Sequence, residues 1–426
     1  MEGHITEIIN KDEYRQKFGM VMRALRIRNR FTLRGLGGLI NLSHAHLRKI
    51  EMAQTSINEK VFDRLMNVYH FNLEYDAKIE SEFEYYCEQF HDSILQLNNN
   101  NMRKYYHLIQ QKADVHKRSL WMVDYQIVEL AYQCQTLDRF VDNLTILYDE
   151  LYALEPLINP SSKPLYYIYM ANYYYHIGLP KKSAASVQKI FDLNTRDKYT
   201  AMANYLIGMA YAKTFSLQKS NKHFNLSLKM FQNLNYTIQE KAVLVFIAIN
   251  NIRMKYFNDI ETIFNEGISL SKHYGLYDLI EYIHLHYAVY YFKKNAPLNA
   301  LEQLDKSTIK TEQWFFYKAY AHYINNDIDT MNQTIESSFY ADKEQRKTDL
   351  LYHYALKALL TPKMANTQSA NAILKNFFEA CQEQSMFFEI DIAYELYKSF
   401  LIEQRQYKKA FSLTKTMVQI TKNAFE

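Results

Sequence analysis

The residues best suited to specific chemistry lie in one stretch, Thr32 to Glu51, which reads TLRGLGGLINLSHAHLRKIE. Ser43 is placed to cap a helix, because a serine side chain accepts a hydrogen bond from a free N–H of the first helical turn. Leu47 and Ile50 recur at helical spacing and form the inner stripe of that helix. The residues left on its outer side are His44, Ala45, Arg48 and Lys49. Cationic and polar groups on such a face can reach the base edges and phosphates of DNA.

No second set of residues suits catalysis or metal binding. The chain has no GxxxxGK[ST], GxSxG or HExxH motif and no GxGxxG after a strand, so nucleotide binding and standard hydrolase chemistry are not indicated. His284 and His286 are two residues apart, as are His44 and His46, so each pair points to different faces of a helix. We therefore expect neither an enzyme nor a cofactor or metal site.

The stretch must be held by neighbouring helices. Apolar residues recur at helical spacing from Tyr14 to Arg28, which predicts a helix there. Thr32 is placed to cap a second helix and Ser43 a third, and the sequence from Ser56 to Glu59 has the form of a capping box that opens a fourth. Together these helices predict a compact bundle.

Composition favours an all-α chain of more than one domain. Only 9 Gly and 6 Pro occur among 426 residues, so turn-forming residues are scarce. Residues 1–72 hold 12 Lys+Arg against 7 Asp+Glu, a charge of +5, while the whole chain carries +4. A local basic excess of this kind suits phosphate neutralisation.

Cysteine spacing and hydropathy predict a cytoplasmic protein with no membrane association. Cys87, Cys134 and Cys381 lie far apart with no CxxC spacing, which favours a reducing compartment. The N-terminal residues have no apolar run suited to a signal peptide. No run of about eighteen apolar residues suits a membrane span.

The first part of the chain resembles a known family. FGMVMRALRIRNRFT followed by LGGLINLSHAHLRKIE is similar to the helix-turn-helix of phage-repressor and Cro-like regulators, over residues 14–72. The resemblance implies double-stranded DNA as a partner. It implies that Ser43, His44, Ala45 and Lys49 touch bases and phosphates and that Arg48 reaches a phosphate. The predicted DNA-binding set is Thr32, Ser43, His44, Ala45, Arg48 and Lys49.

Two departures from that family leave an alternative open. Leu33 stands where family members usually have Gln, which removes one phosphate contact. Gly35 and Gly38 each cost about 1 kcal/mol relative to Ala in a helix interior. In the alternative, the bundle has lost DNA binding and serves only for dimerisation or docking.

From Pro164 onward the chain contains repeated helix pairs. Four segments share a small residue in the first helix, at Ala171, Gly208, Ala248 and Ala288, so the repeats are 37, 40 and 40 residues long. The small second-helix positions are Ser183, Ser220 and Ala300, and the aromatic ones are Phe224 and Phe264. This pattern resembles tetratricopeptide repeats, whose ideal period is 34. Further pairs are expected at 314–339 and 387–417, and degenerate copies at 79–155.

Stacked repeats are expected to form a right-handed superhelix whose concave face is lined by the first helices. Such a face binds extended peptides or partner helices, because Asn pairs with a peptide backbone and aromatic residues form side-chain pockets. Each polar position also suits solvent exposure or helix packing. The expected peptide-binding residues are Asn172, Tyr175, His176, Tyr205, Asn250, Asn251, Arg253, Tyr282 and His286.

The order of the two parts resembles the peptide-sensing regulators of Gram-positive bacteria, the Rap-Rgg-NprR-PlcR-PrgX group. We expect residues 1–72 to form the helix-turn-helix domain and residues 73–426 the repeat domain. The resemblance implies a transcription regulator in quorum sensing, a homodimer on a palindromic operator whose repeats bind a short signalling peptide. The alternative is an interaction adaptor whose repeats bind a protein partner and whose helix-turn-helix is degenerate. A broad exposed patch on the repeats would favour that alternative.

Overall fold

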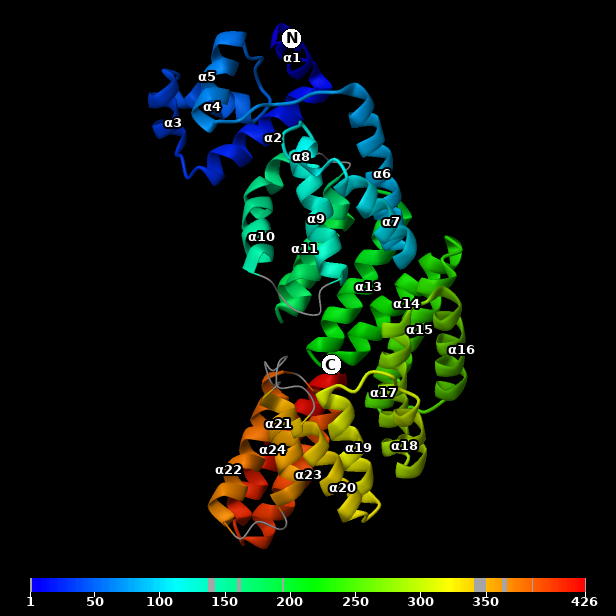
Figure 1. The fold of residues 1–426 in the computed structure, drawn as a ribbon. Coiled ribbons are helices and arrows are strands. Elements are labelled where there is room, and N and C mark those ends of the chain that lie inside the picture. Colours follow the sequence, from blue (N-terminus) through cyan, green and yellow to red (C-terminus); the bar gives the residue numbers. More distant parts are fainter. Residues whose placement is uncertain are drawn as a thin grey trace. The chain divides into compact units, whose positions relative to one another are not determined.

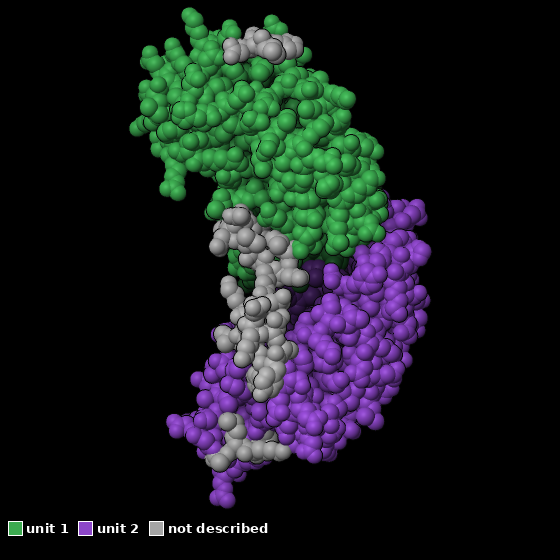
Figure 2. All heavy atoms as spheres, in the orientation of Figure 1, with its two compact units in different colours: residues 1–206 green, residues 207–426 purple. Residues whose placement is uncertain are grey.

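The computed structural model describes residues 2–136, 142–158, 162–193, 195–340, 350–361, 366–384 and 386–425. Within these ranges the regular structure consists of α-helices and two short 3-10 helices, with no strand (Figure 1). The predicted all-α class is therefore confirmed. The chain divides into two compact units, residues 1–206 and residues 207–426 (Figure 2).

The first unit begins with the helix-turn-helix bundle and continues into helix pairs. Its first helices are α1 (Glu2–Ile9), α2 (Asp12–Arg28), α3 (Leu33–Ile40), α4 (His44–Glu51) and α5 (Glu59–Tyr69). The helices that follow are α6 (Ala77–Leu95), α7 (Asn99–Gln110), α8 (Ala113–His116), α9 (Met122–Thr136), α10 (Asp142–Leu154), η1 (Glu155–Leu157), α11 (Lys163–His176), α12 (Pro180–Gln188), η2 (Lys189–Asp192) and α13 (Asp197–Lys213), which runs across the unit boundary.

The bundle agrees with the sequence prediction except at two points. Helix α1 lies before the first helix that the periodicity indicated. The fourth predicted helix, α5, is capped by Asn58, whose side chain accepts the Val61 N–H at 3.0 Å, so the prediction of Ser56 as its cap is wrong. Asn58 directly precedes the first helical residue, whereas Ser56 is two residues too early to reach the free N–H groups of that turn.

The bundle also packs on the helices that follow it within the first unit. Tyr14 donates to Glu80 at 3.0 Å, and the amide of Gln16 donates to the Leu157 carbonyl at 3.0 Å. Arg28 binds the Glu150 carboxylate through Nε and Nη2. A domain boundary near residue 72, between α5 and α6, stays a prediction.

The repeat register agrees with the buried side chains. The small positions Ala171, Ala248 and Ala288 are fully buried, as is Ser183. Gly208 shows why the position must be small, because a Cβ there would lie 2.6 Å from the Phe224 ring. The expected pair at 314–339 is α19/α20 and that at 387–417 is α23/α24; α21/α22 was not predicted.

The second unit consists of further helix pairs that pack in chain order. Its helices are α14 (Leu217–Asn233), α15 (Thr237–Arg253), α16 (Ile260–Tyr274), α17 (Tyr277–Lys293), α18 (Pro297–Asp305), α19 (Glu312–Ile324), α20 (Ile328–Tyr340), α21 (Leu350–Leu360), α22 (Thr367–Glu383), α23 (Phe387–Glu403) and α24 (Tyr407–Phe425).

Distant helices of the second unit also meet. Helix α24 packs on α14, and Lys293 of α17 pairs with Asp391 of α23. Glu389 of α23 is 2% exposed and accepts hydrogen bonds from the hydroxyls of Tyr317 and Tyr352 at 2.7 and 2.9 Å. Because a buried carboxylate is stable only when such donors surround it, this cluster holds α23 against α19 and α21.

Candidate functional site

Helices α3 and α4 form the helix-turn-helix, and both predicted caps are present. The Thr32 hydroxyl accepts the Gly35 N–H at 3.0 Å, and the Ser43 hydroxyl accepts the His46 N–H at 3.2 Å. The turn between the helices passes through Asn41, which adopts a left-handed conformation with φ 53°. These caps satisfy free N–H groups at the starts of two short helices, so the local sequence itself specifies where each helix begins.

The turn is tight because Gly37 allows a close approach. A Cβ at Gly37 would lie 2.5 Å from the Leu42 carbonyl oxygen, so only glycine fits without displacing the backbone. Gly38, one residue later, has no heavy atom within 4 Å of the same position. The two adjacent glycines thus have different roles: one is required by the contact between α3 and α4, and the other only weakens the helix.

Helix α4 buries one face and exposes the other. Leu47 and Ile50 are each 2% exposed and face the bundle. Arg48 and Lys49 are exposed, and neither makes a side-chain hydrogen bond or ion pair with any described residue. The remaining members of the predicted DNA-binding set are exposed as well: Thr32, Ser43, His44 and Ala45.

A buried ion pair fixes α4 to α2. Glu51, 5% exposed, binds the guanidinium of Arg26 with both carboxylate oxygens, at 2.5 and 2.9 Å. The same guanidinium donates to the Phe31 carbonyl at 3.1 Å. The hydrogen bonds to Glu51 raise the pKa of Arg26, so the guanidinium stays charged. Residues 26 and 51 are on different helices and no local spacing relates them, so the sequence does not predict this pair.

Four predicted peptide-binding residues belong to the first unit. Asn172, Tyr175 and His176 lie on α11, and Tyr205 lies on α13. Asn172, Tyr175 and Tyr205 are partly buried, and His176 is exposed. The rings of Tyr175 and His176 lie 6.1 Å apart.

In the second unit, three predicted residues lie near one another. The rings of Tyr282 and His286 on α17 are 4.4 Å apart in an edge-to-face contact. Arg253 at the end of α15 lies 5.9 Å from the ring of Phe387. Burial and the Arg253 charge lower the pKa of His286 to about 3, so the imidazole is neutral at physiological pH. Burial also raises the pKa of Tyr282, and the positive charge of Arg253 acts in the opposite direction.

The two asparagines of α15 belong to interhelix contacts. Asn250 is 1% exposed, and its amide donates to the Ser220 hydroxyl at 2.8 Å and to the Asn221 side chain at 2.9 Å. Asn251 is partly exposed and accepts a hydrogen bond from Asn221 at 3.1 Å. A peptide could bind Asn250 only by breaking buried hydrogen bonds, so we assign Asn250 to the packing of α15 on α14.

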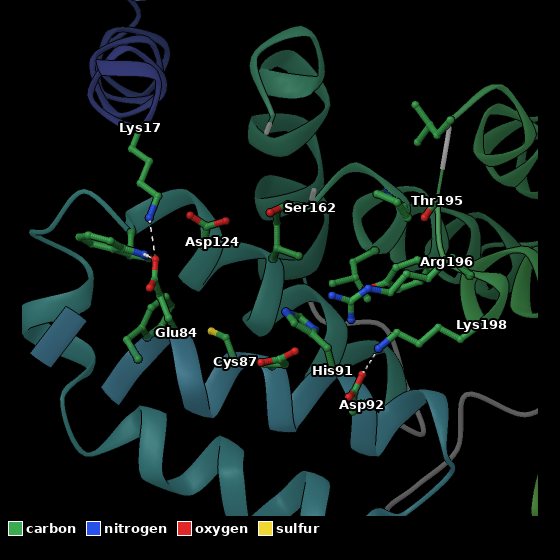
Figure 3. Close-up of a pocket in the computed structure, with 18 of the residues that line it drawn as sticks. Lys17, Glu84, Cys87, His91, Asp92, Asp124, Ser162, Thr195, Arg196 and Lys198 are labelled. Carbon is green, nitrogen blue, oxygen red and sulfur yellow. Dashed lines mark hydrogen bonds and ion pairs between the residues drawn. The ribbon is translucent and has the colours of Figure 1, made fainter. Parts of the chain in front are cut away.

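The first unit contains a cavity of 490 Å³ that no sequence motif predicts (Figure 3). Its walls come from α2, α6, α9, α11 and the start of α13, and from residues just before α9, α11 and α13, including Arg196. Lys17 of α2 pairs with Glu84 at 3.0 Å, and Lys198 pairs with Asp92 at 2.5 Å. Five helices far apart in sequence contribute to the cavity lining, so no motif could have revealed the site.

Two cavity residues, His91 and Cys87, stay uncharged. His91 Nδ1 lies 2.8 Å from the Tyr169 hydroxyl, and burial together with Lys198 lowers the pKa of His91 to about 3. Burial raises the pKa of the Cys87 thiol, which remains protonated. The described residues contain no group of three or more His, Cys, Asp or Glu placed to hold a metal ion.

No family model matches this chain, and no curated protein matches its sequence. Among solved structures, the apo form of the quorum sensor NprR from B. thuringiensis matches with a TM-score of 0.58 at 13% identity, covering 80% of this chain and 99% of that chain. This chain shares the fold of that sensor. The apo form of RapI also matches, with a TM-score of 0.49 at 14% identity, over 81% of this chain and 97% of that chain. In the described part of the chain, no helix is both long and apolar enough to cross a bilayer.

Proposed function

We propose that this protein is a DNA-binding transcription regulator whose helical repeats bind a short signalling peptide. The observation that carries the proposal is helix α4, which is capped at Ser43, buried through Leu47 and Ile50, and free on its outer face at Arg48 and Lys49. A recognition helix that enters the major groove needs this division between a packed face and an exposed polar face.

Charge supports DNA as the partner. The bundle carries twelve basic and seven acidic residues, and one of the acidic residues, Glu51, is neutralised internally by Arg26. Arg48 and Lys49 therefore face solvent with no anionic partner among the described residues. Both can release counterions from phosphates on binding, which makes affinity strongly dependent on salt.

The shared fold supports a peptide as the signal. NprR is a quorum sensor, and its solved chain matches 80% of this one. In the second unit, Arg253, Tyr282 and His286 combine a cation with aromatic surface. This combination can hold the carboxylate and an apolar side chain of a peptide. Asn251 on α15 belongs to the same proposed contact set of the second unit. In the first unit, taken by itself, Asn172, Tyr175, His176 and Tyr205 on α11 and α13 are proposed as separate peptide contacts.

Pairing of two copies would place two helix-turn-helix bundles on a palindromic operator. Helix α24 offers an apolar face for pairing, because Tyr407, Phe411 and Val418 are 63, 63 and 62% exposed. Replacing Phe411 with Glu tests this surface. We expect the wild-type chain to be a dimer by light scattering and the variant a monomer; a variant that stays dimeric would place the interface elsewhere.

The DNA proposal is tested by in vitro selection of bound DNA followed by titration of the full chain on the selected sequence. The double variant Arg48→Ala, Lys49→Ala should weaken specific binding at least about tenfold and reduce the salt slope by about one for each phosphate that is no longer bound. Its control is Arg103→Ala, Lys104→Ala, an exposed Arg-Lys pair on α7 with the same change in charge. Equal weakening in both variants, or none in either, would refute the role of α4.

The peptide proposal is tested by affinity selection from a synthetic heptapeptide library with the full chain. Bound sequences should share a motif, and the selected peptide should change the affinity or the footprint of the protein on its operator. The variant His286→Ala should bind that peptide at least about tenfold more weakly than wild type. A library that yields no enriched sequence would favour the adaptor hypothesis instead.

A further inference from the structure

The cavity of the first unit has the size and composition of a ligand site, and neither the DNA contacts nor the proposed peptide contacts use it. Its 490 Å³ falls in the range of about 300–1,000 Å³ that small-molecule pockets occupy. Apolar side chains line part of it, among them Met20, Ile127 and Leu165, and charged groups line the rest.

Most of the charged lining residues neutralise one another. Lys17 and Glu84 form one ion pair and Lys198 and Asp92 another. Glu88, Asp124 and Arg196 differ from these, since none of the three forms an ion pair with any described residue. In Figure 3 the Arg196 guanidinium enters the cavity from the side opposite Lys17 and Glu84, and the Asp124 carboxylate lies near Lys17 and Glu84.

The surroundings of Asp124 favour a cationic ligand. Burial raises the pKa of Asp124, and the nearby Glu84 charge raises it further, while Lys17 and a hydrogen bond from Ser162 act in the opposite direction. An ammonium group placed beside Asp124 would relieve the cost of keeping that carboxylate charged in a partly desolvated site. Arg196 offers a complementary site for an anion, because a guanidinium binds a carboxylate through two parallel hydrogen bonds.

We propose that this cavity binds a small zwitterion, with its ammonium at Asp124, its carboxylate at Arg196 and its apolar body against Met20, Ile127 and Leu165. This chemistry belongs to free amino acids and to peptides of two or three residues. A longer peptide exceeds the cavity unless only one of its ends enters.

The cavity is placed to influence the DNA-binding bundle. Lys17 and Met20, which line it, belong to α2, and Arg26 of the same helix fixes the recognition helix through Glu51. Lys17 also lies 3.7 Å above the ring of Trp121, which donates to Glu84 at 3.3 Å. A ligand that binds one placement of α2 more tightly than another shifts the population of that placement. This coupling rests on the proposed function, whereas ligand binding in the cavity does not.

Binding is tested by calorimetry of the full chain without DNA. The probes are a mixture of free L-amino acids and, separately, a mixture of tripeptides with free ends. Tripeptides acetylated at the N-terminus or amidated at the C-terminus serve as controls for each charge. We expect one free-ended mixture to bind, and blocking either end to weaken binding about tenfold or more. Binding of the amino acids alone would identify them as the ligand, and binding of the tripeptides alone would identify short peptides. Binding of neither mixture would overturn the proposal.

Two variants connect the measurement to the residues. Asp124→Asn should abolish the difference between free and acetylated probes, and Arg196→Gln the difference between free and amidated probes. The matched controls are Asp149→Asn and Arg103→Gln, positions that do not line the cavity. If both cavity variants bind all probes as the wild type does, the ligand does not occupy this site and the proposal fails.

Coupling is measured separately, by repeating the operator titration with the cavity ligand at saturation. A change in operator affinity that disappears in Asp124→Asn would support coupling, and an unchanged affinity would overturn it. A chain that binds no DNA sequence would overturn the proposed function, while calorimetry would still decide whether the cavity binds a zwitterion.

Discussion

Replacing Glu51 with Ala is expected to loosen helix α4 without changing the side chains that we propose to face DNA. The change removes both acceptors of the Arg26 guanidinium, at 2.5 and 2.9 Å, and leaves only the Phe31 carbonyl at 3.1 Å. The Glu51 side chain is 6% exposed and that of Arg26 15%, so water can only partly replace the missing carboxylate. An isolated cation then remains inside the bundle.

The magnitude follows from the burial of the pair. Breaking a buried ion pair by removing one partner costs about 3–5 kcal/mol, and the residual exposure of Arg26 places this case near the lower end, at about 3 kcal/mol. Replacing both residues with apolar ones, as in Arg26→Met with Glu51→Leu, removes the stranded charge. This double variant is therefore expected to lie within about 1 kcal/mol of wild type or above it.

Hydrogen exchange of the α2 and α4 amides, measured by mass spectrometry on the full chain, reports the local free energy of opening. A loss of about 3 kcal/mol corresponds to exchange more than about 100-fold faster in Glu51→Ala. The exposed control Asp63→Ala on α5 should change exchange by less than about threefold. Exchange in Glu51→Ala within threefold of wild type, or a double variant as fast as the single one, would refute the assignment of this ion pair.

Three further predictions concern stability. Gly37→Ala should destabilise the bundle by about 1–3 kcal/mol, because the new methyl group would lie 2.5 Å from the Leu42 carbonyl oxygen. Gly38→Ala should stabilise the bundle by up to about 1 kcal/mol, because no atom lies near the new methyl group. Hydrogen exchange of the α3 amides measures the stability of both variants. Burial lowers the pKa of His116 to about 4, below its unfolded value of about 6.5, so stability present above pH 6.5 is lost as pH falls toward 4, by up to about 1.4 kcal/mol per pH unit. The urea midpoint of unfolding, followed by Trp121 fluorescence, should therefore fall between pH 6.5 and pH 4. If His116→Gln shows the same fall as the wild type, the assignment to His116 is wrong. In the second unit, Glu281 accepts hydrogen bonds from the backbone N–H and the hydroxyl of Thr308. Glu281→Gln should therefore lower the free energy of unfolding by about 1–3 kcal/mol, followed by Trp314 fluorescence. An unchanged free energy of unfolding would show that those hydrogen bonds do not stabilise the unit.

The sequence predicted features that depend on local spacing. Thr32 and Ser43 cap their helices in the structure, since a cap and the N–H group that it accepts are three residues apart. The repeat positions Ala171, Ala248 and Ala288 are buried as predicted, because the same helix pair recurs along the chain. The prediction of Ser56 as a cap was wrong for a local reason. Asn58 directly precedes the helix, and its side chain accepts the Val61 N–H that a capping residue must reach.

Long-range contacts could not be predicted in this way. Asn250 had the polarity expected of a peptide contact, but only the packing of α15 on α14 places its amide between Ser220 and Asn221. The cavity combines Lys17, Asp124 and Arg196, which come from distant parts of the chain and share no periodic pattern. Their proximity depends on how helix pairs stack, which sequence spacing does not encode.

By itself the sequence determined the helical class, the caps of α3 and α4 and the register of the repeats, because these follow from interactions within one or two turns or from a period repeated along the chain. Tertiary structure alone decided that Arg26 and Glu51 meet, that Gly37 must remain glycine while Gly38 need not, and that a charged cavity lies beside α2. The physical reason is the same in each case. These features depend on the distance between helices, and that distance is set by the packing of side chains that are far apart in sequence.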